Sequence, residues 1–420
     1  MGTVSKAKDL AHRLRRSFFY NLPFAAAATI WRRLLFRTTF IAVTGSNGKT
    51  TTKDLLAALL ATRHPTMKTT GSDNGRVGLS RTILRTRLWH RFAVLEIGID
   101  APGLMWRAAL QARPDIVVVT SVAAEHSENF SSLDVTAAEK AKLLRGLGRR
   151  GFAVLNGDDR RVREMAGPGD FRSVFFGVSR KWDLWADQIH GNWPDRMRLR
   201  VHSGDRTYEV ATRLVGMQWA TPVLAALLAA RECGIDPAEA VPEIARLEPH
   251  PARMQPVRLP SGAVLIRDEY NGSAGTTAAA FQVLAQARAA RRVVILSDVT
   301  DDHRPVEQRL LALGKAAGRV AEVVVFVGPD SRIGARGAVE AGLNPDSAFG
   351  LPRLEDAVSW LRHNLRQGDL ALLKGRNLDH LSRIYLALLG PVACWTTNCT
   401  RRILCDICPE LGRKDALPPT

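Results

Sequence analysis

Short apolar runs alternate with stretches of helical apolar spacing along most of the chain. Apolar runs bounded by turn residues predict buried strands, here over residues 40–43, 92–98, 114–121, 151–159 (with a turn), 293–298, 323–328 and 370–375. Helical spacing predicts helices over 53–60 and 137–147. Strands that alternate with helices indicate an α/β fold with a parallel, doubly wound sheet. Ligands of such sheets bind beyond the carboxyl ends of the strands.

The first strand runs into a loop that contains glycines. Residues 44–52 read Thr-Gly-Ser-Asn-Gly-Lys-Thr-Thr-Thr and lead into the helix 53–60. Loop amides and a helix N-terminus attract phosphate, while Lys49 can reach the outer phosphates and Thr50 can hold Mg²⁺. Val43 stands where the usual pattern has another glycine, so the loop is a shortened variant. We predict a nucleoside triphosphate site made by Gly45, Ser46, Asn47, Gly48, Lys49, Thr50 and Thr51.

Polar side chains stand at or just past the ends of the next predicted strands. They are Glu96, His126 and Asn156. A charge at the end of an apolar strand is costly to bury unless it is paired or bound to metal. Each residue taken alone has an ordinary alternative interpretation. Glu96 would be a surface carboxylate, His126 a loop histidine and Lys140 a solvated lysine on a helix. Together they are candidates for one site.

Composition and charge favour a globular protein with an anionic ligand. Of the 420 residues 46% are apolar and the net charge is +18, which predicts two or three domains with ample core. No recognition motif for DNA or RNA stands out. Anionic small molecules, ATP among them, are therefore favoured over nucleic acid.

The N-terminal segment is basic. Residues 1–38 carry eight Lys or Arg and one acid, Asp9. The uncharged stretch 18–31 has 14 residues, fewer than the roughly 20 that span a membrane, and it is a poor fit to a signal peptide. We expect a helical packing element. The alternative is a basic amphipathic helix that rests on an anionic membrane.

Four of the five cysteines crowd into the C-terminal tail with the spacing C-x₄-C-x₅-C-x₂-C. An ATP-dependent enzyme implies the cytoplasm, where disulfides are rare. Cys394, Cys399, Cys405 and Cys408 therefore predict a structural Zn²⁺ site. An iron–sulfur cluster and four unrelated thiols are the alternatives.

Eight short motifs follow one another along the chain, at residues 44–52, 95–98, 123–126, 139–142, 155–159, 251–253, 268–271 and 373–375. Together they resemble the Mur ligases, ATP-dependent amide ligases of peptidoglycan precursor synthesis, and look closest to the branch that adds D-alanyl-D-alanine. The resemblance covers roughly residues 40–390. It implies a central ATP-binding domain and a Rossmann-like C-terminal domain. The expected divisions are 1–39 (basic helical segment), 40–250, 251–391 and 392–420 (Cys-rich tail).

The resemblance also implies a mechanism and roles for residues. In this family the ATP γ-phosphate passes to a substrate carboxylate, and an amine then attacks the acyl phosphate. Lys49 would bind the β- and γ-phosphates, Thr50 and Glu96 one Mg²⁺, and His126 a second, while Lys140 matches the family's carbamylated lysine. Nucleotide contacts would come from Asn156, Arg253 and Asp268. Substrate contacts would come from Asn74, Tyr270, Asn271, Lys374 and Arg376.

The chain departs from the family pattern in four places. Only about 40 residues precede the loop, so we expect this chain to lack the N-terminal domain by which the family grips a uridine nucleotide. Residues 216–219 and Pro222 differ from the family where adenine is contacted, and Trp219 would stack on a base or belong to the core. The turns at 268–274 and 374–377 differ where the amine is selected, so we expect an amine other than D-alanyl-D-alanine. The cysteine tail is the fourth departure.

These observations favour an ATP- and Mg²⁺-dependent ligase that joins an amino acid or short peptide amine to a carboxylate acceptor in a specialised pathway. One alternative is a D-alanyl-D-alanine-adding ligase of cell-wall synthesis, with a partner protein that supplies the missing acceptor-binding domain. A polyglutamate-type synthetase shares the same core. A non-catalytic, nucleotide-gated binding protein on the same scaffold is the alternative from another class.

Overall fold

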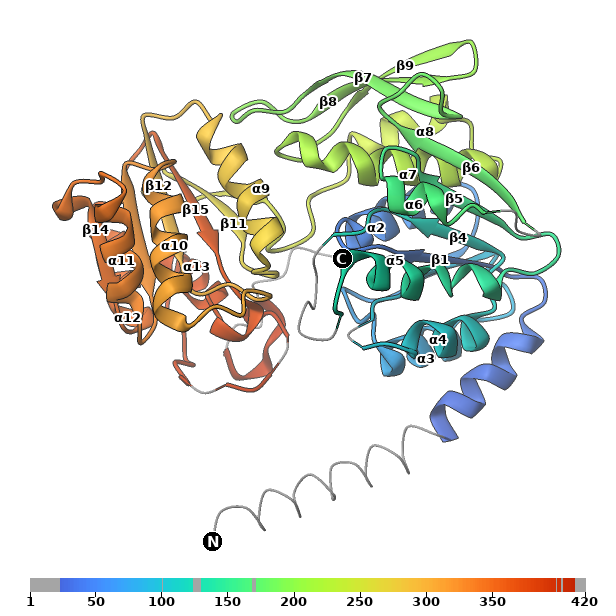
Figure 1. The fold of residues 1–420 in the computed structure, drawn as a ribbon, viewed down its shortest axis with the longest axis horizontal. Coiled ribbons are helices and arrows are strands. Elements are labelled where there is room, and N and C mark those ends of the chain that lie inside the picture. The colour runs from blue at the N-terminus through green and yellow to red at the C-terminus, as the bar shows by residue number, and fades with distance from the viewer. Residues whose placement is uncertain are drawn as a thin grey trace, which may run out of the picture.

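The computed structural model describes residues 23–99, 101–123, 130–167, 171–397, 399–401 and 403–411. Two α/β units, each built on its own sheet, lie side by side (Figure 1). Among the described helices, none has the length and apolar character needed to cross a bilayer.

The first unit is built on a sheet with nine strands among the described residues. The strands from β2 to β7 pair in parallel, and β8 and β9 extend one edge in antiparallel. In spatial order they are β2 (Thr66–Lys68), β3 (Phe92–Glu96), β1 (Thr39–Thr44), β4 (Ile116–Val119), β5 (Phe152–Asn156), β6 (Arg172–Gly177), β7 (Leu184–His190), β8 (Arg198–Ser203) and β9 (Arg206–Ala211). The helices are α2 (Lys49–Ala61), α3 (Arg76–Arg85), α4 (Leu104–Ala112), α5 (Leu133–Ala141), α6 (Arg160–Glu164), α7 (Ala220–Glu232) and α8 (Pro237–Ile244).

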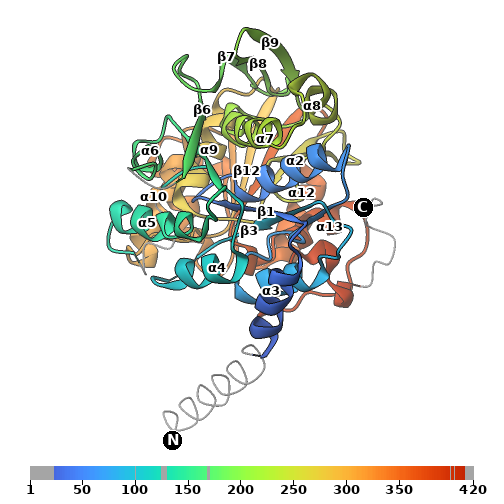
Figure 2. The ribbon, with the colours of Figure 1, turned by 90° about the vertical axis from the view of Figure 1, so that its right-hand side faces the viewer.

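Both faces of this sheet are buried, and the side-chain alternation of β1 divides its residues between two cores. Ile41 and Val43 belong to one core, and Phe40 and Ala42 belong to the other. α2 and α7 cover the first face, while α3 and α4 cover the second (Figure 2). This three-layer arrangement is what the continuous apolar runs of the strands require.

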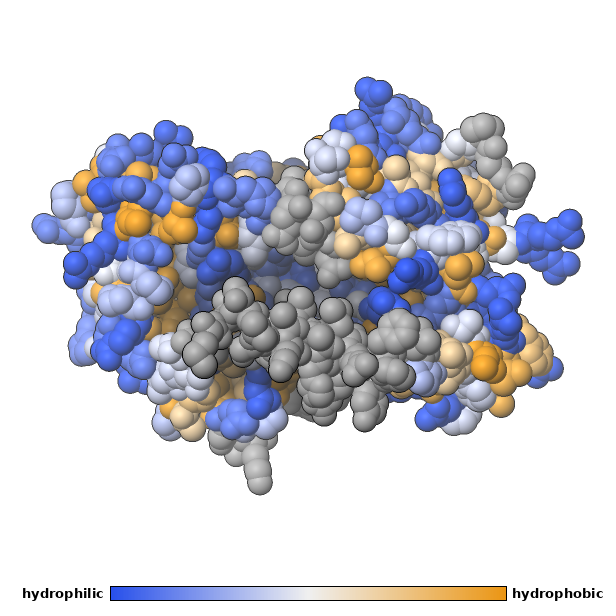
Figure 3. Space-filling model, turned by 60° about the horizontal axis from the view of Figure 1, so that its bottom comes forward, coloured by the Kyte–Doolittle hydropathy of each residue, from blue (hydrophilic) through white to orange (hydrophobic). Residues whose placement is uncertain are grey.

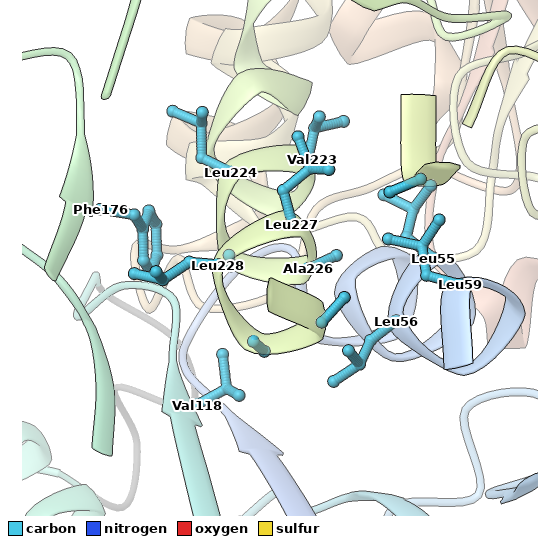
Figure 4. Close-up of a cluster of buried hydrophobic side chains, with 14 of the residues drawn as sticks. Leu55, Leu56, Leu59, Val118, Phe176, Val223, Leu224, Ala226, Leu227 and Leu228 are labelled. Carbon is cyan, nitrogen blue, oxygen red and sulfur yellow. The ribbon is translucent and has the colours of Figure 1, made fainter. Parts of the chain in front are cut away.

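α7 is the central packing element of the first core, since its residues 222–230 are all buried. In Figure 4, Leu228 points toward Phe176 of β6, while Leu55 of α2 lies on the other side of α7. The N-terminal turn of α7 touches the glycine loop. A Cβ built on Gly48, which has φ 82°, would lie 2.9 Å from Cγ of Pro222. Pro222 is tolerated there because the first turn of a helix needs no amide donor.

The second unit is built on a sheet of six strands within the described ranges, parallel except for the pair β10–β11. In spatial order they are β10 (Gln255–Arg258), β11 (Val264–Asp268), β15 (Asp369–Lys374), β12 (Arg291–Leu296), β13 (Val323–Val327) and β14 (Ala348–Leu351). Its helices are α9 (Ala274–Ala285), α10 (Val306–Gly318), α11 (Ser331–Glu340), α12 (Leu354–Asn364) and α13 (Ser382–Leu389). The tail follows α13 and holds two short 3₁₀ helices, Cys405–Ile407 and Pro409–Leu411.

The predicted α/β class with parallel sheets is confirmed; one helix has other bounds than expected, and one sheet edge was not predicted. The helix expected over 137–147 is α5, which begins earlier because the Ser132 hydroxyl accepts a hydrogen bond from the amide of Val135. Its continuation is a separate 3₁₀ turn, Leu144–Gly146. The antiparallel edge β7–β9 was not predicted, since its half-exposed, arginine-containing strands lack the long apolar runs of the buried ones.

The expected N-terminal packing element is present in the described residues as a helix over 23–34. Ala28 and Leu35 are buried in the second core. The Arg32 guanidinium donates to the carbonyl oxygens of Ala112 at 2.7 Å and Arg113 at 2.7 Å, at the C-terminal end of α4. Residues 1–22 lie outside the described residues.

Candidate functional site

The glycine loop joins β1 to α2 and is fastened to the end of β4. The amide of Ser46 donates to the Ser121 carbonyl at 2.8 Å, and the Thr120 hydroxyl donates to the Asn47 carbonyl at 2.6 Å. Gly45 has φ 140°, and a Cβ there would lie 2.0 Å from the Thr120 hydroxyl. Only glycine therefore fits at that position. The loop is held open at the N-terminus of α2, where backbone amides can meet phosphate.

Lys49 lies over this loop. Its Nζ donates to the carbonyl oxygens of Gly45 at 2.8 Å and Ser46 at 2.9 Å, and the side chain is 9% exposed. Thr50 and Thr51 follow in the first turn of α2 and are buried. The residues of the predicted phosphate loop are thus close together, and the ammonium group of Lys49 lies over the loop.

Glu96, at the end of β3, stands beside Thr50, as the parallel pairing of Val43 with Glu96 requires. Oε1 of Glu96 accepts hydrogen bonds from the Thr50 hydroxyl at 3.1 Å and from Nδ2 of Asn74 at 2.8 Å. Glu96 is fully buried, and its Oε2 has no hydrogen-bond partner among the described residues. A buried carboxylate oxygen next to a threonine hydroxyl is a suitable ligand pair for a hard cation such as Mg²⁺.

Sequence analysis missed Lys53 and Ser72, which surround this carboxylate. Nζ of Lys53 lies 3.8 Å from Oε2 of Glu96 and donates to the carbonyls of Thr69 and Gly71. The Ser72 hydroxyl is 2.9 Å from that of Thr50. For Ser72 the only signal in the sequence was the polar, glycine-rich composition of the loop 69–79, and Lys53 is one lysine of the predicted helix 53–60.

Arg253 belongs to the second unit and reaches the first. Its Nη2 donates to the Ser72 hydroxyl at 3.1 Å, and its guanidinium lies 4.5 Å from the ring centre of Tyr270. Its Nε is buried and has no hydrogen-bond partner in the described part of the chain. Arg253 is therefore fixed close to Thr50 with donor capacity to spare, as a phosphate ligand from the second unit would be.

Asp268 and Lys374 face each other at the ends of paired strands β11 and β15. Nζ of Lys374 donates to Oδ2 of Asp268 at 2.6 Å, to the Asn271 carbonyl at 2.6 Å and to the Thr276 hydroxyl at 3.2 Å. Burial raises the pKa of Asp268 and lowers that of Lys374, while their mutual attraction opposes both shifts. This ion pair fixes the turn that carries Tyr270 and Asn271.

Two residues in the substituted motifs are held by internal ion pairs. The Arg376 guanidinium is paired with Asp379 at 2.7 Å and with Asp298 at 3.2 Å. Oε1 of Glu269 accepts from Arg267 at 2.6 Å and from the Ser382 hydroxyl at 2.9 Å, on the side of β11 away from Asp268. These two side chains therefore give no structural reason for a different amine.

The remaining candidates have separate places. Asn156, at the end of β5, donates to the Thr120 carbonyl at 2.8 Å and accepts from the amide of Asp158 at 3.0 Å, so it shapes the strand-end turn. Lys140 is buried on α5. Its neighbour Glu139 accepts from the amide of Gly103 at 2.7 Å, at the start of α4. His126 lies outside the described residues.

Trp219 belongs to the core. It packs against the main cores of both units, and its Nε1 donates to the Val215 carbonyl at 3.0 Å. The alternative in which this ring stacks on a base has no support in its contacts.

Cys394, Cys399, Cys405 and Cys408 line one cavity of about 350 Å³, together with His380 and Arg383. Sγ of Cys405 lies 3.5 Å from Nδ1 of His380, and burial raises the pKa of this thiol to about 11. Across the described ranges, no three His, Cys, Asp or Glu side chains are grouped so that they could hold a metal ion. The predicted Zn²⁺ site thus has no support from the arrangement of its cysteines.

A phosphate loop, a buried carboxylate and an arginine from a second α/β unit define an ATP-dependent ligase of the acid–amino-acid class. The chain matches the Mur ligase middle domain over residues 43–230 and the Mur ligase glutamate ligase domain over 252–377. It is 30% identical over 376 residues to UDP-N-acetylmuramoyl-tripeptide–D-alanyl-D-alanine ligase of Mycobacterium bovis, covering 85% of this chain and 74% of that protein. The chain belongs to the Mur ligase family.

Further relatives agree with this assignment. The ligase of the same name from Escherichia coli is 30% identical over 291 residues, which cover 68% of this chain and 64% of that protein. Among solved structures, MurF from Acinetobacter baumannii superposes with a TM-score of 0.80 at 22% identity, covering 88% of this chain and 80% of that one. MurF from Thermotoga maritima, solved with ADP, gives a TM-score of 0.73 at 22% identity, with 87% and 82% covered.

Proposed function

We propose that this chain is a ligase that joins D-alanyl-D-alanine to a UDP-N-acetylmuramoyl tripeptide, with ATP converted to ADP and phosphate. The observation that carries the proposal is the meeting of Thr50, Glu96 and Arg253 at the glycine loop, in a chain 30% identical to ligases of that name. Glu269 and Arg376, which suggested another amine, are both held by internal ion pairs.

The chemistry is transfer of the γ-phosphoryl group to the tripeptide carboxylate, attack of the amine on the acyl phosphate, and departure of phosphate. Lys49 and the loop amides would hold the triphosphate, and Arg253 would neutralise charge that develops during transfer. Thr50 and Glu96 would hold Mg²⁺, which offsets the negative charge of the phosphates. Asn74, Tyr270, Asn271 and Lys374 would shape the substrate end.

Two roles are proposed from the resemblance. Lys140, as a carbamate, would supply an anion in place of its buried cation. His126 would be a second Mg²⁺ ligand. Both residues follow β4 in the chain. The carboxyl end of β4 lies beside the glycine loop, which supports a place for both residues near the nucleotide.

The assay is product mass. Purified protein is incubated with ATP, Mg²⁺, bicarbonate, UDP-N-acetylmuramoyl tripeptide and D-alanyl-D-alanine, and the new amide and ADP are measured by mass spectrometry. Parallel reactions replace the dipeptide by glutamate or other amino acids, or the acceptor by a folate. The proposal expects product with the dipeptide and none from Lys49→Ala. Product only with glutamate and a folate would overturn it.

The same reactions test the partner protein. If the muramyl substrate gives product only after addition of a cell extract from the source organism, a partner supplies acceptor binding. If the purified chain suffices, the partner hypothesis is wrong.

A further inference from the structure

One surface of the first unit exposes large apolar side chains. Ile30 and Leu34 lie on the helix 23–34, Phe36 follows it, and Leu88 and Trp89 lie in the turn after α3. They are 62%, 53%, 81%, 62% and 68% exposed, respectively. The helix has a separate buried face, marked by Ala28 and Leu35, so these exposed residues are not needed for its packing. We call this group of five side chains the N-terminal apolar surface.

Hydrogen bonds hold the two segments side by side. Trp31 Nε1 donates to the Thr86 carbonyl at 2.8 Å, and the Thr38 hydroxyl donates to the His90 carbonyl at 2.7 Å. The Arg91 guanidinium donates to the Arg37 carbonyl at 3.0 Å. The two segments that carry the five exposed apolar side chains are therefore neighbours in space, although more than fifty residues separate them in the chain.

The charged residues of the two segments that carry this surface are all cationic. Arg33, Arg37, Arg87 and Arg91 are exposed on the same two segments. Residues 23–38 and 84–95 contain no Asp or Glu. The carboxylate that contacts the helix, Asp115, is half exposed and is paired with the buried Arg32 at 3.2 Å. Figure 3 shows apolar and strongly polar residues next to each other at the lower right of the molecule.

We propose that the N-terminal apolar surface docks on an anionic lipid bilayer. Phe36, Leu88 and Trp89 would enter the headgroup region, and the flanking arginines would contact lipid phosphates. An anionic bilayer offers an apolar acyl region for the apolar side chains and many lipid phosphates for the arginines, all in one plane. A protein partner would need acids placed opposite each arginine. This inference is independent of the proposed ligase reaction, because no residue of the surface belongs to the nucleotide or substrate site.

The test is vesicle flotation of the purified full-length protein. Vesicles contain phosphatidylcholine alone or equal parts of phosphatidylcholine and phosphatidylglycerol, at about 0.1 M and about 0.5 M NaCl, where screening differs strongly. The variants are Leu88→Ser/Trp89→Ser and Arg33→Gln/Arg87→Gln. The matched control, Val178→Ser/Arg180→Gln, removes an exposed apolar residue and an exposed arginine from the β6–β7 turn.

We expect binding to the anionic vesicles only, weakened at the higher salt. Loss of two arginines should weaken it about 25-fold, at about fivefold each, and loss of the two apolar tips by about tenfold or more. The circular dichroism spectrum and the thermal unfolding midpoint should stay unchanged in all variants, which shows that they fold whether or not the ligase proposal holds. Binding that the control weakens as much as the test variants would overturn the proposal. So would absence of vesicle binding together with self-association that Leu88→Ser/Trp89→Ser abolishes, because the occupant would then be a second copy.

Discussion

Replacing Arg267 by Met should destabilise the protein more than any exposed-arginine replacement. Arg267 is 1% exposed and donates to Glu269 at 2.6 and 2.9 Å and to Asp406 of the tail at 2.6 and 2.9 Å. Without the guanidinium, a fully buried carboxylate and a largely buried one would face each other with no cation between them. Breaking a buried ion pair from one side costs about 3 to 5 kcal/mol, which sets the expected loss of unfolding free energy.

The loss should depend on pH. Burial raises the pKa of Glu269, and Arg267 opposes that rise. In Arg267→Met the pKa of Glu269 therefore rises further, and the folded state binds a proton that the unfolded state releases. Stability linked to such a group falls as pH increases. The deficit should be smaller at about pH 5 than at about pH 8.

Urea unfolding at both pH values measures these differences. Arg336→Met is the control, since Arg336 pairs with Glu307 at the surface and its loss should cost about 0.5 kcal/mol or less. The double variant Arg267→Met/Glu269→Gln should recover part of the loss, because it removes one of the two unpaired charges. A deficit for Arg267→Met no larger than that of the control would refute the reasoning.

Further predictions concern the site. Glu96→Gln should lower phosphate release by about 10²-fold or more while ATP still binds, because the buried anion is lost; unchanged turnover would exclude Glu96 as a metal ligand. Arg253→Lys should cost about 10²-fold in kcat, since lysine cannot keep both the Ser72 contact and the Tyr270 stacking; a change in KM alone would contradict this. Activity should fall when bicarbonate is removed and return when it is restored, and Lys140→Ala should not respond. Burial lowers the pKa of His250 to about 4, so stability should fall by up to about 3 kcal/mol as pH drops from 6.5 toward 4; acid unfolding of His250→Gln should lack this component.

Sequence reasoning found the elements whose signals are local. The glycine loop, the buried strands β1, β3, β4 and β5 and the carboxylate Glu96 are visible as motifs because each is fixed by neighbours in sequence or by one parallel register. Lys53 and Ser72 were missed because their contacts with Glu96 and Arg253 join residues far apart in the chain. The spacing of apolar residues along the chain does not show which distant residues meet in the fold.

The cysteine tail shows a different limit. Its spacing alone predicted a tetrahedral metal site, whereas the described cysteines only line one cavity. The tail is held by the ion pair of Asp406 with Arg267 of β11 and by contacts with α13 and the residue His380 before it. The Arg383 guanidinium donates to the Thr396 carbonyl at 2.6 Å, and His380 Nε2 lies 3.0 Å from the Cys399 carbonyl. Arg383 and His380 precede the tail residues that they contact by 13 and 19 residues, respectively, so the cysteine spacing does not reveal these contacts.

The substituted turn after β11 illustrates how a departure from a family motif should be weighed. Successive residues of a strand point to opposite faces, so Asp268 faces the site with Lys374 while Arg267 and Glu269 share the opposite face. On that face lie Ser382 and Asp406. The carboxylate at position 269 therefore helps to bind Arg267, which holds the tail through Asp406. Its presence is explained by the tail and does not indicate a different amine substrate. Arg376, in the other substituted turn, pairs with Asp298 and Asp379, so internal charges hold both of these substituted side chains before any substrate arrives.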